Sequence, residues 1–425
     1  MKKIPLIAKI LVAFVAGTAT GLALSEWAAP ETVKRILPWV SPFGSALVAM
    51  LKAVVYPIIF FSLVTGAASL PLRKSGKVGL KVIGWYTATS LFATVFGVVL
   101  AWLMNPKMSG ATTLAAGHLD GAKAIAANGQ AASLGEFIVG MFQNPFSALA
   151  NGQFLPIIVF AIAFGLAARW LLDGNDDDSS SKRTVQVVID VCDGVQRIAF
   201  KLIDCVIAYF PIGIFALLTV NFAQNGTLLF GPYARITVCV ITGVAAMIGV
   251  IYPLAVAVTC RENPYRVMLK MRSAIVTAFV TRSSAATLPV SFRTMDEMGV
   301  ARSLSSVSLP VGATVNMDGV CVHPPVFVIL AANMFGKALG VVDVATLCLM
   351  IMFASIGAGG LPGGSIFLLF MVLENMGLTP EQVSLIVALA LGINPILDMF
   401  ETCCNVTGDN VCTYIVGKTS GMVKQ

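Results

Sequence analysis

The chain has 425 residues, of which 57% are hydrophobic and only 12% are charged. A water-soluble domain carries about 25% charged residues, so this chain cannot cover a surface that faces water and must use lipid as its solvent. The formal net charge is +7. In a membrane protein, an excess of basic residues reflects the lysines and arginines of the cytoplasmic loops, which set its orientation, and it does not indicate a nucleic-acid partner. The composition therefore excludes a soluble domain of useful size and predicts an all-α polytopic membrane protein.

The first apolar run, from residue 6 to residue 27, follows two lysines, as a signal peptide would. The run is long and many more apolar runs follow it, so we expect a retained helix. Since a spanning helix needs about 20 apolar residues, six ordinary spans are expected. They lie at about 5–27, 44–70, 77–104, 138–172, 190–222 and 228–260. Pro57 and Pro156 are expected to kink or break their helices.

Basic residues cluster in the loops that come after every second span, and short loops rich in lysine and arginine stay on the cytoplasmic side. The clusters are Lys2 and Lys3, then Arg73, Lys74, Lys77 and Lys81, then Lys182 and Arg183, and then Arg261, Arg266, Lys270 and Arg272. The pattern predicts a multi-pass protein of a bacterial inner membrane with both termini in the cytoplasm.

The nine cysteines are scattered through apolar segments without a CxxC pair, and we interpret them as small buried residues. His118 and His323 are isolated in the sequence. A metal site built from histidine and cysteine is therefore not expected.

Beyond residue 264, polar residues and prolines interrupt the apolar runs at membrane depth. Irregular backbone there is tolerated only where it is buried in protein or lines a cavity. The interruptions form two matching sets, each with a broken apolar stretch and then a segment that bears acids. The broken stretches are 281–289 (TRSSAATLP) and 355–365 (SIGAGGLPGGS), and the acid-bearing segments are 316–319 (NMDG) and 394–409. We predict two re-entrant hairpins with Leu-Pro tips, which enter from opposite sides as inverted repeats around a binding site.

The last helix carries polar side chains at spacings of four, four, three and four residues, which places them on one face. They are Asn394, Asp398, Thr402, Asn405 and Asp409, and Glu401 lies beside them. With Asp318, four carboxylates face one strong candidate base, Arg282. Left ionised and unpaired, they would cost on the order of 10 kcal/mol. The deficit of positive charge indicates bound metal cations, bound protons or a cationic group of a substrate, and each of these indicates transport.

The oxygen atoms available at these positions favour Na⁺, because carboxylates, amides, hydroxyls and freed carbonyls are hard donors that suit hard cations. Side-chain oxygens come from Asn316, Asp318, Asn405 and Asp409. Unwound carbonyls around 312–317 and in the second hairpin supply more. Helix N-termini at the hairpin tips suit a substrate carboxylate. H⁺ coupling stays the main alternative to Na⁺.

Four motifs, TRSSAATLPV, GATVNMDG, LPGGS and LDMFETCCNVTGDN, resemble in this order those of the dicarboxylate/amino-acid:cation symporter family, the glutamate-transporter homologues. The resemblance spans nearly the whole chain. It implies eight transmembrane helices plus two opposed re-entrant hairpins, a homotrimer and an elevator-like movement gated by the hairpins. The domains that it implies are scaffold helices 1–2 at 1–75, helix 3 and an extracellular loop at 76–135, trimerising scaffold helices 4–5 at 136–225, and a transport domain at 226–425.

The resemblance also implies which residues form the site. Substrate contacts are implied for Arg282, Ser283, Ser284, Met317, Val320, Gly360, Leu361, Pro362, Gly363, Asp398, Glu401, Thr402 and Asn405. Among these, Asp398 resembles the aspartate that binds the substrate ammonium. Three Na⁺ sites are implied: site one with Gly312, Asn316, Asn405 and Asp409, site two with Thr314, Met317, Ser355, Ile356 and Ala358, and site three with Tyr86, Thr89, Ser90, Asn316 and Asp318. We expect two to three ions per protomer.

Two departures from the acidic-substrate members of the family bear on the substrate. Those members have arginine where this chain has Glu401 and threonine where it has Val320. A glutamate repels a substrate carboxylate at short range, and valine cannot form a hydrogen bond with it. Both positions resemble the serine/threonine symporter branch, so we expect Na⁺-coupled uptake of a small neutral amino acid. A basic amino acid that pairs with Glu401, or a dicarboxylate, stays the alternative substrate.

Two other function classes fit the sequence less well. A channel needs a continuous polar pore, whereas these polar residues cluster at one depth. An intramembrane aspartyl protease needs the GxGD signature, and Val406 stands where its first glycine belongs. We therefore expect a transporter and no enzyme.

Overall fold

The computed structural model describes residues 6–69, 76–104, 139, 142–151, 154–174, 179–357 and 364–424. Within these ranges the chain is helical, and the one pairing of extended segments is an isolated bridge between Val300 and Val423. The predicted all-α fold is confirmed. Seven helices of the described ranges are long and apolar enough to cross a membrane, so the chain is a multi-pass membrane protein. The division into eight helices plus two hairpins stays a prediction.

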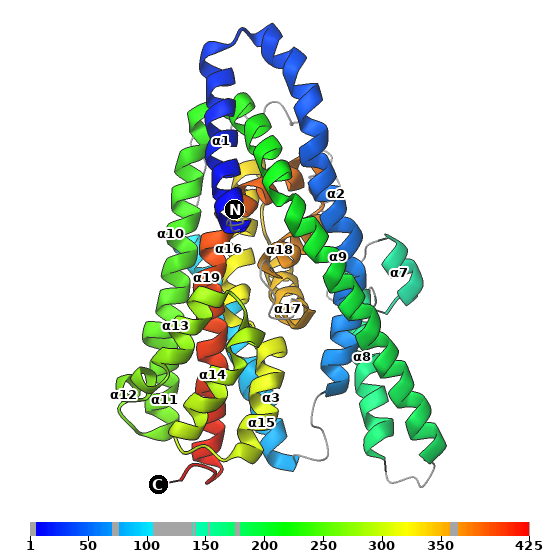
Figure 1. Cartoon of the computed structure of the whole chain (residues 1–425), viewed down its shortest axis with the longest axis vertical. Coiled ribbons are helices and arrows are strands. Elements are labelled where there is room, and N and C mark those ends of the chain that lie inside the picture. Colours follow the sequence, from blue (N-terminus) through cyan, green and yellow to red (C-terminus); the bar gives the residue numbers. More distant parts are fainter. Residues whose placement is uncertain are drawn as a thin grey trace, which may run out of the picture.

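Figure 1 shows the helices, coloured from the N-terminus to the C-terminus. They are α1 (Leu6–Trp27), α2 (Pro30–Ser69), α3 (Gly76–Met104), α7 (Pro145–Asn151), α8 (Phe154–Asp173), α9 (Ser179–Asn225), the 3₁₀ turn η1 (Gly226–Leu229), α10 (Phe230–Ala246), the π-helical turn η2 (Met247–Ile251), α11 (Tyr252–Cys260), α12 (Pro264–Lys270), α13 (Arg272–Thr281), α14 (Ser284–Glu297), α15 (Arg302–Val315), α16 (Asp318–Phe335), α17 (Val341–Gly357), α18 (Gly364–Asn375) and α19 (Pro380–Thr419). The spans predicted at 5–27 and 77–104 match α1 and α3, whereas α2 and α9 run well beyond the predicted bounds.

Neither of the two prolines expected to kink or break a span breaks its helix. Pro57 lies inside α2, which continues as one helix to Ser69. Pro156 lies in the first turn of α8, which begins at Phe154. Proline is tolerated there because the first N–H groups of a helix have no intrahelical acceptor.

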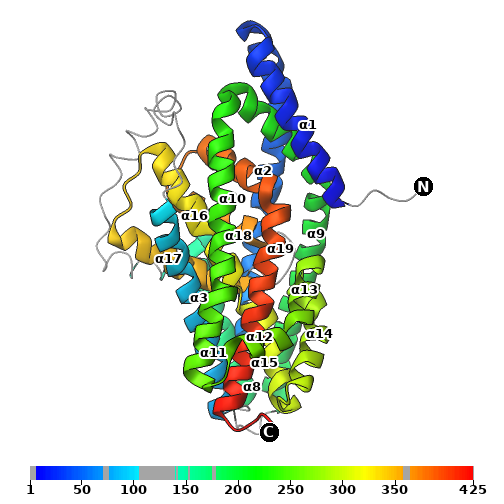
Figure 2. The same cartoon turned by 90° about the vertical axis from the view of Figure 1, so that its left-hand side faces the viewer.

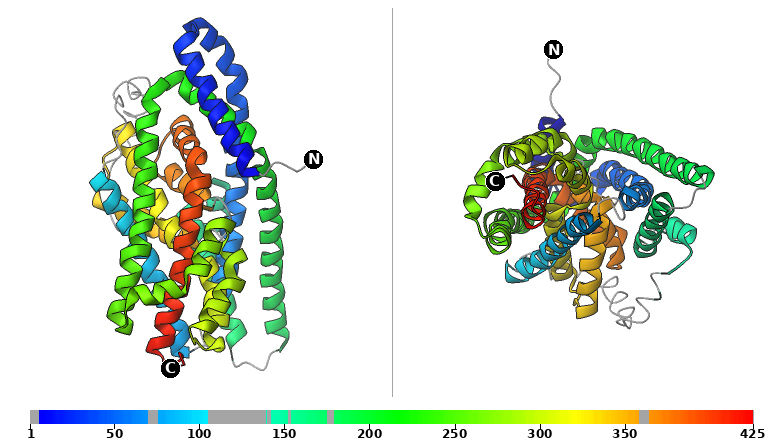
Figure 3. Two further views of the ribbon diagram at one scale, coloured as in Figure 1. Left: turned by 60° about the vertical axis from the view of Figure 1, so that its left-hand side comes forward. Right: turned by 90° about the horizontal axis from the view of Figure 1, so that it is seen from below.

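Helices α1, α2, α8 and α9 pack against one another on one side of the molecule. Gly17 and Gly21 of α1 allow a close approach to α9, because a Cβ atom at either position would lie 2.7 Å from a backbone oxygen of that helix. Small residues four positions apart bring the backbones of membrane helices together in this way. In Figure 3, α2, α8 and α9 lie on the side of the molecule opposite α19.

A second group of helices gathers around α19, which contacts α10, α13, α15, α16 and α18. Figure 2 shows α10 and α19 side by side along the long axis. Almost all of α19 from Ile386 onwards to Gly417 is buried, and α16 is buried nearly throughout. These two helices carry all four carboxylates that the sequence singles out, so the acids are buried inside protein.

Helices α13 and α14 form the first predicted hairpin, here called hairpin 1 (272–297), but its tip is not at Leu-Pro. The turn consists of Arg282 and Ser283. Leu288 and Pro289 lie inside α14, so the predicted tip is wrong for this hairpin. Ser283 begins α14 because its side chain accepts a hydrogen bond from Ala286 N and so caps the helix. The Leu-Pro sequence of the second hairpin, Leu361 and Pro362, lies outside the described residues.

The NMDG segment interrupts the helical path between α15 and α16, as predicted. Asn316 and Met317 have φ/ψ angles of −100°/79° and −104°/54°, which are not helical, and α16 begins at Asp318. The break lies beside the buried face of α19 and frees backbone groups there. Such a break inside a membrane protein is tolerated where protein surrounds it.

Candidate substrate and cation site

The polar face of α19 is buried along its whole length. The helix begins with a capping box in which Thr379 and Gln382 satisfy each other's backbone N–H groups. The residues predicted to share one face, Asn394, Asp398, Thr402, Asn405 and Asp409, are each at most 4% exposed. A row of buried polar side chains needs partners, because burial without hydrogen bonds is costly.

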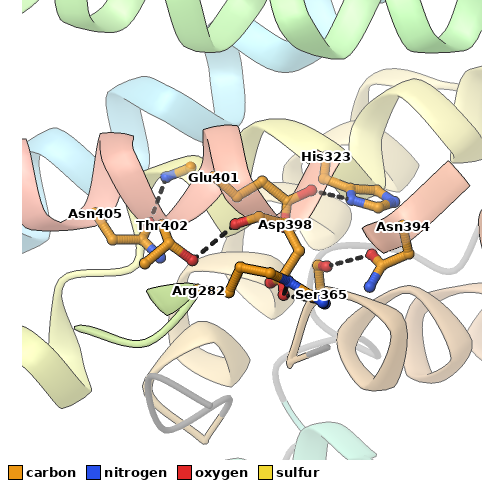
Figure 4. Close-up of polar contacts among 9 residues, drawn as sticks. Arg282, His323, Ser365, Asn394, Asp398, Glu401, Thr402 and Asn405 are labelled. Atoms are coloured by element: carbon orange, nitrogen blue, oxygen red, sulfur yellow. Dashed lines mark hydrogen bonds and ion pairs between the residues drawn. The ribbon is translucent and has the colours of Figure 1, made fainter. Parts of the chain in front are cut away.

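Asp398 is paired with Arg282 at the tip of hairpin 1. Arg282 Nη2 lies 2.7 Å from Asp398 Oδ2, and Arg282 Nε donates to the same oxygen at 2.9 Å. Arg282 has a φ of 54°, in the left-handed region that a side chain rarely adopts. The strained turn lets the guanidinium reach the carboxylate. Figure 4 shows this ion pair beside Thr402, whose hydroxyl donates to the Asp398 carbonyl at 2.7 Å.

Glu401 is paired with His323, a residue that the sequence analysis left without a function. His323 Nδ1 and Glu401 Oε1 are 2.5 Å apart, and both side chains are fully buried. Arg282 is thus joined near the acids by a histidine, a weaker base that the sequence analysis did not pair with any of them. The pairing could not be found from the sequence, since 78 residues separate the two partners.

Of the four acids that the sequence singles out, Asp318 and Asp409 have no basic partner among the described residues. Asp318 accepts hydrogen bonds from Ser90 Oγ at 2.8 Å and from Tyr252 OH at 2.7 Å. Asp409 accepts one from Asn316 Nδ2 at 3.1 Å. Neutral donors form hydrogen bonds with each carboxylate but do not neutralise its charge, so neither acid is balanced by a charged side chain of the described residues.

Tyr252 is a site residue that the sequence analysis missed. It directly follows the π-helical turn η2, which adds a residue to the turn and changes the direction of the side chains after it. Tyr252 OH lies against the Asp318 carboxylate, and a Cβ atom at Gly408 would lie 2.7 Å from that hydroxyl. Because Gly408 has no side chain, the Tyr252 hydroxyl and the Asp318 carboxylate can both lie against the backbone at this position.

The five residues of the third predicted Na⁺ site come together around the break between α15 and α16. Thr89 Oγ1 donates to Asn316 Oδ1 at 3.0 Å, and Ser90 donates to Asp318. Tyr86 donates to the Ser308 carbonyl at 2.9 Å. These residues supply the oxygen-rich surroundings that a hard cation needs.

Residues of the first predicted Na⁺ site also lie together. A Cβ atom at Gly312 would lie 2.6 Å from Asp409 Oδ1 and 2.7 Å from Tyr86 OH, so only glycine leaves room for both groups. Asn316 bonds Asp409. Asn405, one turn before Asp409, accepts a hydrogen bond from Gly319 N at 2.7 Å and contacts Met317 Sδ.

The second predicted Na⁺ site depends on backbone carbonyls of the second hairpin and stays a prediction. Thr314 is exposed, and its hydroxyl bonds the Val311 carbonyl of its own helix. Met317 is buried, and the hydroxyl of Ser355 bonds Met352 O inside α17. Ile356 is half-buried at the end of α17. The remaining member, Ala358, lies outside the described residues.

The hydroxyls of hairpin 1 differ in what they contact. Ser283 caps α14, whereas the Ser284 hydroxyl is buried without a hydrogen-bond partner among the described residues. Val320 is buried in the first turn of α16. The predicted substrate contacts of the second hairpin tip, Gly360, Leu361, Pro362 and Gly363, lie outside the described residues.

The function of this buried polar site can be judged from proteins of similar sequence. The profile of the sodium:dicarboxylate symporter family matches residues 6–419. The chain belongs to the sodium:dicarboxylate symporter family. As expected from the four motifs, this symporter is a sodium-coupled secondary transporter and not an enzyme.

Several curated proteins are similar to this symporter over nearly its whole length. A serine/threonine transporter SstT of Acinetobacter baumannii (strain AYE) is 31% identical over 418 residues, which cover 97% of this chain and 96% of the relative. SstT of Acinetobacter baylyi is 28% identical over 420 residues and 98% of both chains. Excitatory amino acid transporter 3 of Homo sapiens is 28% identical over 450 residues, 96% of this chain and 84% of the relative.

Proposed function

We propose that the chain couples the entry of Na⁺ to the uptake of a small neutral amino acid such as serine, threonine or alanine. The observation that carries the proposal is that Asp318 and Asp409 are buried without a basic partner in the described residues, so imported cations must balance them. The similarity to serine/threonine transporters favours a neutral amino acid. So does Glu401, an anion where acidic-substrate members of the family have arginine.

In this proposal the substrate binds between hairpin 1 and α19. Its ammonium shares the Asp398 carboxylate, which Arg282 holds through one oxygen. The guanidinium and the free hydroxyl of Ser284 then lie near the substrate carboxylate, and Thr402, Met317 and Val320 line the pocket. A guanidinium forms short charge-assisted hydrogen bonds with carboxylates, which suits this role.

Two to three Na⁺ ions per protomer bind at the sites inferred from the sequence. Sites one and three share Asn316 and contain the two unpaired acids, which supports their assignment. Site two depends on carbonyls next to the second hairpin tip. The carboxylate and amide oxygens of the first and third sites are ligands that hard cations prefer.

The transport domain (76–135 and 226–425) moves across the membrane relative to the scaffold (1–75 and 136–225) of a homotrimer in a bacterial inner membrane, with both termini in the cytoplasm. The division is supported by the packing of α1, α2, α8 and α9 as one group and of α3, α10, α13, α15, α16 and α18 against α19 as another. The family resemblance supports the trimer and the elevator movement.

A thermal-shift screen of the purified chain against the twenty amino acids, in Na⁺ and in K⁺, tests the proposal. We expect serine, threonine and alanine to raise the melting temperature in Na⁺ and not in K⁺, since ligand binding to the folded state stabilises it. Stabilisation by aspartate or lysine instead of serine would assign another substrate. Stabilisation by serine that is equal in K⁺ would rule out Na⁺ coupling.

A further inference from the structure

The His323–Glu401 pair leaves one polar atom on each side chain unused. His323 Nε2 and Glu401 Oε2 are buried and have no hydrogen-bond partner among the described residues. With Glu401 ionised, its carboxylate only accepts hydrogen bonds, so the ring then donates from Nδ1 to Oε1 and Oε2 is an open acceptor. Unsatisfied buried polar atoms are rare in folded proteins and call for an explanation such as a ligand or a water molecule.

The position of the pair follows from the close packing of α16 on α19. A Cβ atom at Gly319 would lie 2.3 Å from the Glu401 carbonyl, so the two backbones approach each other at this point. His323 lies four residues after Gly319 and thus on the same face of α16. Its ring stacks on Phe327 with 4.7 Å between the ring centroids, which fixes the ring plane.

Glu401 lies three residues after Asp398, so the two carboxylates belong to neighbouring turns of one face. Figure 4 shows that Asp398 points to Arg282 and that Glu401 points to His323. A substrate whose ammonium binds Asp398 therefore brings its side chain towards the fixed Glu401 carboxylate.

We propose that His323 is a positioning residue that holds Glu401 so that its free Oε2 accepts a hydrogen bond from the hydroxyl of the substrate side chain. The proposal rests on the proposed amino-acid transport and narrows its substrate class to hydroxyl-bearing amino acids. Serine and threonine have the required donor, and alanine and 2-aminobutyrate have the same carbon skeletons without it. A substrate carboxylate is excluded because it offers no donor to an acceptor.

A hydroxyl fits this site better than a cationic side chain does. Both Glu401 and His323 are 0% exposed, so an ammonium or guanidinium that reached Glu401 would have to give up its hydration. Valine at position 320 adds apolar surface and no acceptor. A short neutral donor makes one hydrogen bond at Oε2 without adding a second buried charge.

The test measures the dissociation constants of serine and alanine in Na⁺ for the wild type and three variants in purified full-length protein. His323→Phe keeps a ring that can stack on Phe327 and removes the donor. His323→Asn keeps a donor near the position of Nδ1. Tyr233→Phe is the matched control, because it removes one buried polar atom without a hydrogen-bond partner from a ring outside the site.

We expect wild-type serine to bind about tenfold more tightly than alanine, the value of one well-placed hydrogen bond. His323→Phe reduces this ratio to about one, and His323→Asn and Tyr233→Phe retain it. A ratio that stays unchanged in His323→Phe overturns the proposal. So does a wild type that binds lysine more tightly than serine.

Competition in the wild type decides the question even if His323→Phe does not fold. Serine must outcompete alanine, and threonine must outcompete 2-aminobutyrate, by about tenfold. Equal affinities in each pair, with Na⁺-dependent binding intact, overturn the role of the pair and leave the proposed transport standing. If no amino acid binds in a Na⁺-dependent way, the proposed transport itself fails.

Discussion

Arg282 Nη2 lies 2.7 Å from Asp398 Oδ2, so the tip of hairpin 1 is tied to α19 at the carboxylate expected to bind the substrate ammonium. The two groups are 13% and 5% exposed, which places the pair at the edge of the buried polar face. A substrate ammonium that binds Asp398 must share this carboxylate with the Arg282 guanidinium or displace the guanidinium from it. Substrate binding and the position of hairpin 1 are therefore coupled through one carboxylate.

Asp398→Asn removes the charge that holds both the guanidinium and the substrate ammonium. We expect the variant to bind serine about 100-fold more weakly or not at all, since hydrogen bonds to charged groups contribute up to about 3 kcal/mol. Isothermal titration in Na⁺ measures the loss. Asp296→Asn is the matched control, because it breaks an exposed ion pair with Arg302 at 2.6 Å outside the site. Serine affinity equal to wild type in Asp398→Asn would contradict the assignment.

Asp409→Asn lowers the negative charge at the first predicted Na⁺ site while keeping a side chain of the same shape. We expect the Na⁺ concentration for half-maximal serine binding to rise about tenfold or more. A Na⁺ titration of the serine-induced thermal shift provides the measurement. Asp190→Asn on α9, where the aspartate bonds Gln186 at 2.8 Å, serves as the control. An unchanged Na⁺ requirement in Asp409→Asn would show that this carboxylate does not balance a transported ion.

Glu401→Arg places a cation where a substrate side chain is expected to end. Preference should shift from serine towards aspartate, because a guanidinium pairs with a carboxylate and no longer accepts from a hydroxyl. His323 loses its partner in this variant, so serine affinity should fall as well. Combining it with Val320→Thr should strengthen aspartate binding further. Competition between the two amino acids gives the ratio, and a double variant that still prefers serine refutes our interpretation of position 401.

Glu262 lies in the loop between α11 and α12, outside the candidate membrane spans, and links this loop to the end of α19. Lys418 Nζ lies 2.5 Å from Glu262 Oε1, and Tyr414 OH donates to Oε2 at 2.7 Å. The hydrogen bond from Lys418, and then that from Tyr414, hold the pKa of Glu262 below its ordinary value. A lowered pKa stabilises the folded state above the ordinary pKa, about 4.3. This stability is lost as the pH falls through the lower folded value.

We expect Glu262→Gln to lower the melting temperature at pH 7 by about 1–2 °C, because the pair is partly exposed and screened by solvent. The difference from wild type should shrink as the pH falls below about 4. Glu31→Gln, which breaks the exposed Lys34–Glu31 pair, is the control. A difference that is constant between pH 7 and pH 3 would show that the ionised carboxylate does not stabilise this contact.

Features that depend on local pattern could be predicted from the sequence. The polar face of α19 follows from residue spacing alone, and the break at Asn316 and Met317 follows from polar residues at membrane depth. The same holds for the two unpaired acids, because burial of Asp318 and Asp409 follows from the apolar segments around them.

Features that depend on contacts between distant segments could not be predicted. His323 looks isolated in the chain, and its partner becomes visible only when α16 packs on α19. Tyr252 reaches Asp318 across 66 residues, after a π-helical turn that no local signal announces. The tip of hairpin 1 was misplaced because a proline such as Pro289 can lie inside a membrane helix when its surroundings satisfy the freed backbone groups.

The central claim is that imported Na⁺ balances the two buried acids that lack a protein base, and uptake into proteoliposomes tests it most directly. Radiolabelled serine is offered under an inward Na⁺ gradient, an inward H⁺ gradient, or neither, with K⁺ in place of Na⁺. The account predicts accumulation of serine with the Na⁺ gradient and none above equilibration in the other two conditions. Accumulation driven by the H⁺ gradient without Na⁺ would contradict it.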